Sequence, residues 1–319
     1  MKKQLLVLLI LLPIFSFGQA NKLFRKAINS KDSKEKIELF TKVIALEPKN
    51  FDAFFYRGIA KNDLGDYYGA ILDYSKVIVY EPDADLYFNR GNSKYSLQDY
   101  NGAKSDYENA LKHDPRFIDA QYNLAFTKYY LEDYMGALMD LNTVINIVPN
   151  ESQMYIQRAN TLLALEKHKL ALEDFTLAIL IDPTAENYFN RGLTHLNVNY
   201  YKQAKNDFNR SLNFDSSNIS AYFYRGTSFL LLGKYDKAFS DFKTNLKHDA
   251  LDFEAHLGIA ITYYKMNDFA NARLHFSKVV SILNLDETTS KKLESFTDTF
   301  WYQNQFYFFK ENFEKISQL

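Results

Sequence analysis

Evenly spaced prolines constrain the fold of this chain more than any other feature of its sequence. Pro48, Pro82, Pro115, Pro149 and Pro183 follow one another at intervals of 34, 33, 34 and 34 residues. A period of this length indicates a repeated unit that stacks on its neighbours. Each unit has two stretches with helical spacing of apolar residues joined by a short turn, and proline ends the second stretch. The sequence therefore predicts an all-α fold built from antiparallel helix pairs.

Small residues recur at one position of each predicted helix. A residue no larger than alanine on both partners lets two antiparallel helices approach closely, and larger rings fill the space beside the contact. The first helices carry Gly58, Gly91, Ala125, Ala159, Gly192, Gly226 and Ala260, and twelve residues later the second helices carry Ala70, Ala103, Ala137, Ala171, Ala204, Ala238 and Ala272. The expected packing rings are Tyr74, Tyr107, Phe175, Phe208, Phe242 and Phe276, with Leu141 in the remaining unit.

This helix pair of about 34 residues, with its small residue, alanine, ring and closing proline, resembles the tetratricopeptide repeat. The resemblance covers seven units over residues 51–284, preceded by an incomplete unit at 21–49 and followed by a capping region at 285–319. It implies a right-handed superhelical solenoid. The first helices would line its concave side and the second helices its convex side. It also implies a non-catalytic protein that binds other proteins.

The first twenty residues resemble a secretory signal peptide. Lys2 and Lys3 precede an apolar run over 5–17, and small residues follow up to Ala20. A membrane-spanning helix needs about 20 apolar residues, and Pro13 interrupts a run that is already shorter. We expect cleavage near Ala20 and export to the periplasm or the medium; the alternative is an uncleaved membrane anchor.

The C-terminal region has no glycine or proline, and its aromatic residues follow helical spacing. Tyr302, Phe306, Phe309, Phe313 and Ile316 are predicted to share one helical face. Such a stripe suits a helix that caps the last repeat, since an open solenoid end leaves apolar surface in water. The alternative is an exposed stripe that docks a partner or a membrane.

Arginine on the first helix is followed sixteen residues later by aspartate on the second in five units. We predict an ion pair inside each of these helix pairs, because a charge beside a tight helix contact is partly desolvated and needs a partner. The third unit has Leu124 with Asp140, and the seventh has Ile259 with His275. The predicted pairs are Arg57 with Asp73, Arg90 with Asp106, Arg158 with Asp174, Arg191 with Asp207, and Arg225 with Asp241.

No catalytic constellation stands out in the sequence. The six histidines are expected to lie in different repeats, so no metal-ligand spacing arises, and glycine-rich phosphate-binding motifs are absent. Cysteine is absent, and a net charge of −1 gives no reason to expect nucleic acid as a partner. We therefore expect no enzyme activity, no cofactor and no metal.

The first helices also carry a recurring set of polar and aromatic residues that would line a groove. Amides at equivalent positions of four units could bond to the backbone of an extended peptide, or could bond to neighbouring helices instead. Lys265 is the one basic residue found on this face, so the resemblance does not extend to relatives that clamp a C-terminal carboxylate with lysines. The candidate peptide-binding residues are Asp52, Phe55, Asp85, Phe88, Asn89, Asn92, Asp119, Tyr122, Asn123, Phe126, Gln157, Asn160 and Asn190.

These features together predict an exported scaffold that holds a neutral or basic extended peptide, or another protein, in an envelope complex. The alternative is an accessory subunit of an envelope secretion or polysaccharide-handling machine, docked through its convex face or its aromatic C-terminal helix. The sequence leaves the identity of the partner and the oligomeric state open.

Overall fold

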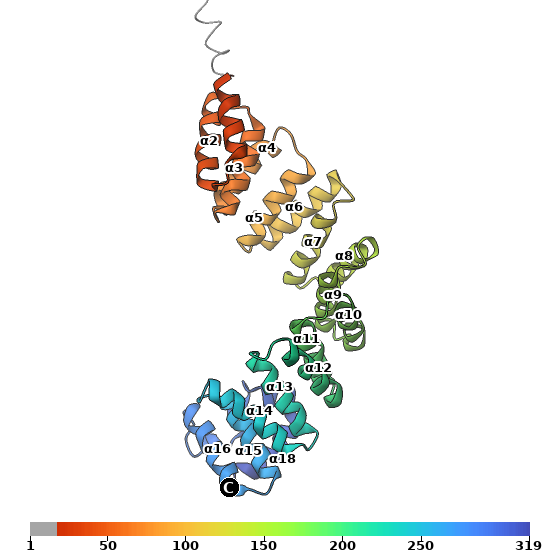
Figure 1. Cartoon of the computed structure of the whole chain (residues 1–319), viewed down its shortest axis with the longest axis vertical. Coiled ribbons are helices and arrows are strands. Elements are labelled where there is room, and N and C mark those ends of the chain that lie inside the picture. Colours follow the sequence, from red (N-terminus) through yellow and green to blue (C-terminus); the bar gives the residue numbers. More distant parts are fainter. Residues whose placement is uncertain (1–17) are drawn as a thin grey trace, which may run out of the picture. The chain divides into compact units, whose positions relative to one another are not determined.

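A computed structural model describes residues 18–319, and within them every regular element is a helix. The helices pack as consecutive pairs (Figure 1). The chain divides after Pro149 into two compact units. No helix in the described part is both long and apolar enough to cross a membrane. Most of the predicted signal peptide, residues 1–17, lies outside the described residues.

The first unit contains four helix pairs. A helix through residue 29 precedes α2, and the first, second and third repeats then follow in order. The helices are α2 (Ser33–Leu46), α3 (Phe51–Asp63), α4 (Tyr67–Ile78), α5 (Ala84–Ser96), α6 (Tyr100–His113), α7 (Ile118–Tyr130) and α8 (Tyr134–Ile147).

The second unit contains the fourth to seventh repeats and the C-terminal region. Its helices are α9 (Ser152–Ala164), α10 (His168–Ile181), α11 (Ala185–Asn197), α12 (Tyr201–Phe214), α13 (Ile219–Leu231), α14 (Tyr235–His248), α15 (Phe253–Lys265), α16 (Phe269–Ile282), α17 (Phe300–Asn304) and α18 (Phe306–Ile316). The predicted all-α fold of antiparallel pairs is confirmed; the right-handed superhelix stays an expectation.

Side-chain caps and turns explain why the helices begin and end where they do. Asp66 caps α4 by accepting a hydrogen bond from the backbone N–H of Gly69 at 2.9 Å, and Asp83 caps α5 in the same way. Gly65 joins the two helices of the first repeat with φ +79°, a left-handed conformation that glycine adopts without strain. Gly233 plays the same part in the sixth repeat.

The spacing of small residues and rings, which recurs in successive repeats, brings each helix pair into close contact. A Cβ atom added at Gly58 would lie 2.6 Å from a ring atom of Tyr74, and one added at Gly192 would lie 2.9 Å from Phe208. The ring of the second helix therefore rests directly on the glycine, and the predicted alanine lies beside that contact. The prediction that these rings serve packing is confirmed, since each is at most 8% exposed.

The five predicted arginine–aspartate pairs are all present inside their repeats. In each, Nε and Nη2 of arginine donate to the two carboxylate oxygens at 2.7–3.0 Å. Each guanidinium also lies over an aromatic ring three residues earlier, as Arg90 lies over Tyr87 at 5.6 Å. A second cation was not predicted: Lys94 also binds Asp106 at 2.7 Å, and Lys61 binds Asp73 at 2.9 Å.

The third repeat keeps its aspartate paired although arginine is missing. Lys128 approaches Asp140 to 2.6 Å, and the amide of Gln121 donates to the same carboxylate at 2.8 Å. Burial raises the pKa of Asp140, while these two donors act in the opposite direction. A lysine on the following turn of the helix thus replaces the arginine as the buried carboxylate's partner.

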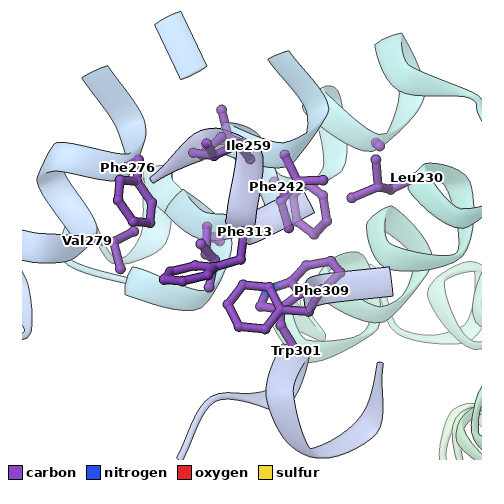
Figure 2. Packing of buried hydrophobic residues seen from close by; sticks show 14 of the residues in the cluster. Leu230, Phe242, Ile259, Phe276, Val279, Trp301, Phe309 and Phe313 are labelled. Carbon is purple, nitrogen blue, oxygen red and sulfur yellow. The ribbon is translucent and has the colours of Figure 1, made fainter. Parts of the chain in front are cut away.

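The C-terminal region packs on the last two repeats rather than standing free. Phe309, Phe313 and Ile316 are buried, whereas Tyr302 and Phe306 are half-buried. Phe313 lies 6.0 Å from the ring of Phe276 on α16, and Trp301 lies beside Phe242 (Figure 2). The single predicted helix is in fact two, because the backbone bends at Gln305 between α17 and α18. This packing favours the capping interpretation over an exposed stripe.

Glu254 in the first turn of α15 anchors this region. Its Oε1 accepts a hydrogen bond from the backbone N–H of Phe300 at 2.6 Å, and its carbonyl oxygen accepts one from Trp301 Nε1 at 3.2 Å. Burial raises the pKa of Glu254 from about 4.5 to about 7, although the Phe300 N–H partly offsets this effect. Glu254 is therefore half protonated near neutral pH.

We predict that Glu254 makes the stability of the chain fall as the pH rises. Because its pKa is higher in the folded than in the unfolded state, the folded chain holds a proton that the unfolded chain releases between about pH 4.5 and 7. Relative to Glu254→Gln, which keeps an oxygen acceptor, the free energy of unfolding should decrease by about 2 kcal/mol between pH 5 and pH 8. Urea denaturation across this range measures the difference, and parallel pH profiles for the two proteins would refute the prediction.

Candidate functional site

A cavity of about 420 Å³ lies among α5, α6 and α7 in the first unit. Four of the candidate peptide-binding residues line it, namely Asn92, Tyr122, Asn123 and Phe126. Tyr95 also lines it, as its place one helical turn from Asn92 on the same face predicts. Ser96 and Tyr107 were not predicted to line a site. We call this cavity the aromatic pocket.

Hydrogen bonds fix the polar base of the aromatic pocket. The hydroxyl of Tyr107 donates to Asn92 Oδ1 at 2.7 Å, and Asn123 Nδ2 donates to the same oxygen at 2.9 Å. Both bonds hold the Asn92 amide in one orientation, with its Nδ2 group available as a donor. The base therefore offers an oriented amide to a carbonyl group of a ligand.

The walls of the aromatic pocket are apolar rings. Tyr122 and Phe126 meet edge to face with centroids 4.7 Å apart. Burial raises the pKa of Tyr107, and burial together with the neighbouring Tyr130 raises the pKa of Tyr95. Both phenols are thus neutral at physiological pH, so the pocket suits an uncharged apolar or aromatic side chain.

The remaining predicted residues of the first unit lie on α3, α5 and α7, the first helices of its three repeats, outside the lining of this pocket. Asp52, Asp85 and Asp119 are exposed in the first turns of α3, α5 and α7. Phe55 and Phe88 are half-buried, each with its ring 6.0 Å from a packing tyrosine of the same repeat. This face thus combines negative charge with aromatic surface.

The four amides predicted as a series have different surroundings. Asn89 Nδ2 donates to the carbonyl of Asp85 in its own helix at 2.8 Å, whereas Asn123 bonds to Asn92 on the preceding first helix. In the second unit Gln157 is buried, and Asn160 and Asn190 are half-buried. Tyr107 was predicted only as a packing ring, because a ring that packs a helix pair has the same spacing as one that also lines a cavity.

The expectation that the histidines lie in different repeats was wrong for two of them. His256 and His275 both belong to the seventh repeat, where their Nδ1 atoms approach to 2.9 Å at the place of the ion pair. Burial, aided by the neighbouring His256, lowers the pKa of His275 to about 4. Two histidines alone do not hold a metal, and no group of three or more ligating side chains occurs among residues 18–319.

Apolar side chains are also exposed on the second helices. On α8, Met135 and Met139 are 54% and 68% exposed, and on α4, Tyr68 and Leu72 are 73% and 71% exposed. The two residues of each helix lie one helical turn apart. They form a second surface, which we call the outer face. It is a candidate surface for the alternative function, in which the chain docks to a larger machine through its second helices.

Comparisons with known proteins agree with this architecture. Family models described as tetratricopeptide repeat match residues 84–117, 152–184 and 185–218. These segments correspond to the second, fourth and fifth repeats. No curated protein matches the chain in sequence.

Solved structures share the fold at low sequence identity. A tetratricopeptide repeat protein from Parabacteroides merdae is 17% identical with a TM-score of 0.56, over 84% of this chain and 99% of that chain. YrrB, a TPR protein with an unusual peptide-binding site, is 21% identical with a TM-score of 0.51, over 58% and 96%. The MamA protein is 18% identical with a TM-score of 0.50, over 52% and 92%. The chain therefore contains tetratricopeptide repeats and has their fold of consecutive helix pairs.

Proposed function

We propose that this chain is a non-catalytic scaffold that binds an extended segment of another polypeptide on the first helices of its first unit. The observation that carries the proposal is the aromatic pocket, where oriented amides lie beneath apolar walls. Such a combination suits an apolar side chain together with the peptide groups that flank it. YrrB, which shares the fold, has a peptide-binding site, and this supports the proposal.

The charge of this face indicates the kind of peptide. Asp52, Asp85 and Asp119 are exposed beside the aromatic residues, so a segment with lysine or arginine near its apolar anchor gains electrostatic attraction. A segment rich in acidic residues is repelled by the same carboxylates.

We predict that Asn92→Ala together with Asn123→Ala weakens the best binder selected from a peptide library about tenfold. The double change removes the oriented amides but leaves the aromatic walls, and two hydrogen bonds of ordinary strength account for such a loss. Isothermal titration calorimetry measures the affinity. Asn101→Ala, which changes an exposed amide on α6 outside the pocket lining, serves as a matched control and should leave the affinity unchanged. Equal affinity for the double variant and the unaltered chain would contradict the proposed site.

The export of the chain is part of the proposal and rests on the pattern of residues 1–20. The charged start, apolar run and small residues near Ala20 suit cleavage by a signal peptidase. We expect the mature chain to begin near Ala20 or Asn21. N-terminal sequencing of the protein from an exported fraction tests this, and an intact Met1 on a cytosolic protein would contradict it.

The alternative function is an accessory subunit that docks to a larger envelope machine through the outer face. The exposure of Met135, Met139 and Leu72 favours it, because exposed apolar side chains one turn apart often mark a contact surface. In that case substitutions on α4 and α8 would disrupt assembly, whereas changes in the aromatic pocket would not.

A further inference from the structure

The sixth and seventh repeats hold a segment of the chain's own C-terminal region, and that contact shows how this fold recognises an aromatic residue. The ring of Phe300 lies 5.4 Å from the rings of both Phe223 and Tyr224 on α13, edge to face with each. The backbone N–H of Phe300 donates to Glu254 Oε1 at 2.6 Å. An aromatic side chain and its own peptide N–H are thus recognised together, and we call this place the tail site.

The first and second repeats carry the same arrangement of residues. A cavity of about 190 Å³ lies among α3, α4 and α5, and we call it the proximal site. In the register of the repeats, every residue that lines the proximal site except Leu86 has a counterpart in the lining of the tail site. Phe55 corresponds to Phe223, Tyr56 to Tyr224, Asp85 to Glu254, Asp83 to Asp252, and Val77 to Asn245.

The ring geometry of the two sites also agrees. Phe55 and Tyr56 are 5.4 Å apart edge to face, and Phe223 and Tyr224 are 5.3 Å apart edge to face. The phenylalanine lies 6.0 Å from Tyr74 in the first repeat, and its counterpart lies 5.7 Å from Phe242 in the sixth. The surface that contacts Phe300 in the tail site is therefore reproduced in the proximal site.

This arrangement is confined to these two places in the chain. The pair of positions that holds Phe–Tyr in the first and sixth repeats holds Phe88–Asn89, Tyr122–Asn123, Ile156–Gln157, Phe189–Asn190 and Leu257–Gly258 in the others. Packing of the helix pairs alone does not require two adjacent rings at this position. The proximal site is thus a specific feature of the first two repeats.

We propose that the proximal site binds a single aromatic residue of a partner polypeptide, whose backbone N–H donates to the carboxylate of Asp85. The inference rests on the proposed function and adds the chemistry of one anchor residue. Of the contacts that the C-terminal region makes in the tail site, we transfer only that of Phe300 to the proximal site. The reason is that Asn89 stands in the proximal repeats where Gly258 stands beside the tail site. The chain's own Phe300 is held next to fully buried Trp301, so the occupant is a partner and not the tail of a second copy.

The charges around the proximal site define the residues next to the anchor. Asp52 takes the place that Ser220 holds in the tail site, and Glu81 and Asp83 also line the cavity. Asp85 itself is exposed, whereas Glu254 is partly covered by the tail. A phenylalanine, tyrosine or tryptophan flanked by lysine or arginine therefore fits better than one flanked by acidic residues.

A synthetic peptide tests the proposal with the full chain. The probe is the acetylated and amidated nonapeptide Gly-Ser-Lys-Thr-Phe-Ser-Lys-Ser-Gly, and its matched partner carries an N-methyl group on the phenylalanine nitrogen. N-methylation removes the proposed N–H donor and leaves the ring in place. Calorimetric titration should show binding of the first peptide and about tenfold weaker binding of the second.

Protein variants complete the test. Asp85→Ala should weaken the unmethylated peptide about tenfold, and Phe55→Leu should weaken it similarly, with folding checked by circular dichroism. Asp83, not Asp85, caps α5, so the Asp85 change leaves the helix start intact. Glu186→Ala is the control, since Glu186 holds the same position in the fifth repeat but follows Ile156–Gln157 and not an aromatic pair.

Three results would overturn the inference: no binding of the unmethylated peptide, equal affinity for both peptides, or unchanged affinity in Asp85→Ala. Peptide binding that appears only with dimerisation in size-exclusion chromatography would also overturn it. If library peptides still lose affinity in the Asn92 and Asn123 double variant, the scaffold function stands without the proximal site.

Discussion

Replacing Trp301 by alanine is expected to lower the free energy of unfolding of the second unit by about 3–5 kcal/mol, the range for truncating large buried aromatic residues. The indole is fully buried, with its ring 6.0 Å from Phe223 and 6.1 Å from Phe242. Truncation leaves a cavity beside these rings, of which Figure 2 labels Phe242, and removes the hydrogen bond from Nε1 to the carbonyl of Glu254. Urea denaturation monitored by circular dichroism measures the change.

Tyr307→Ala is the matched control for this prediction. Tyr307 lies six residues further along the same C-terminal region, and its side chain is 86% exposed. Its truncation should change the free energy of unfolding by less than about 0.5 kcal/mol. A similar, small effect for both variants would mean that the C-terminal region contributes little to the stability of the last repeats.

Asp174→Ala should destabilise the second unit by about 3–5 kcal/mol, because it leaves the guanidinium of Arg158 without its buried carboxylate. Arg158 Nη2 and Asp174 Oδ1 are 2.7 Å apart, and the aspartate side chain is 5% exposed. The hydrogen bonds to Asp174 raise the pKa of Arg158. Without them the arginine still remains charged, because the ordinary pKa of a guanidinium lies far above neutral pH. Chemical denaturation gives the size of the effect.

Two further variants distinguish the loss of stability caused by breaking the buried ion pair from the effect of removing any negative charge. Glu173→Ala removes an exposed carboxylate next to Asp174 and should be close to neutral. Arg158→Leu combined with Asp174→Leu should recover most of the lost stability, since two apolar residues replace both charges. Leu124 already stands at the arginine position of the third repeat. If the double variant were as unstable as Asp174→Ala, desolvated charge would not be the cause.

Much of the fold could be predicted because the same packing contacts and ion pairs recur at equivalent positions of successive repeats. The period of the prolines, the small residues at Gly58 and Gly192, and the spacing of Arg57 and Asp73 all appear several times in register. A pattern that recurs in register excludes alternative helix assignments that the sequence of a single helix pair would leave possible. The lysines at positions 61, 94 and 128 recur in the same way, so the second cation at the aspartate could also have been predicted.

The unrepeated parts could not be predicted in the same way. The bend at Gln305 occurs without glycine or proline, because packing of Trp301 and Phe309 on the last repeats determines where the helix ends. The contact between His256 and His275 occurs once, at positions where other repeats hold different residues. The aromatic pocket also depends on the side-chain direction of Tyr107, which helical spacing alone does not give.

The tail site also explains why acidic residues recur in the first turn of the first helices. Glu254 accepts a backbone N–H from a segment of the chain itself, and Asp52, Asp85 and Asp119 hold the equivalent position in the first unit. A carboxylate near the start of a helix is stabilised by the helix dipole, so this position tolerates a charge that bonds outward to a peptide. The carboxylate at this position thus binds the C-terminal capping region in the second unit and, in our proposal, the backbone of a partner peptide in the first unit.

The most direct test of the proposed function compares one substitution in the aromatic pocket with one on the outer face of the same repeat. Phe126→Ala changes a pocket wall on α7, and Met139→Ala changes a 68% exposed residue on α8. The affinity of the best library peptide for each variant is measured by isothermal titration calorimetry. We predict a loss of about tenfold or more for Phe126→Ala and no change for Met139→Ala. Unchanged affinity for Phe126→Ala with a loss for Met139→Ala would contradict the proposed site and place binding on the second helices.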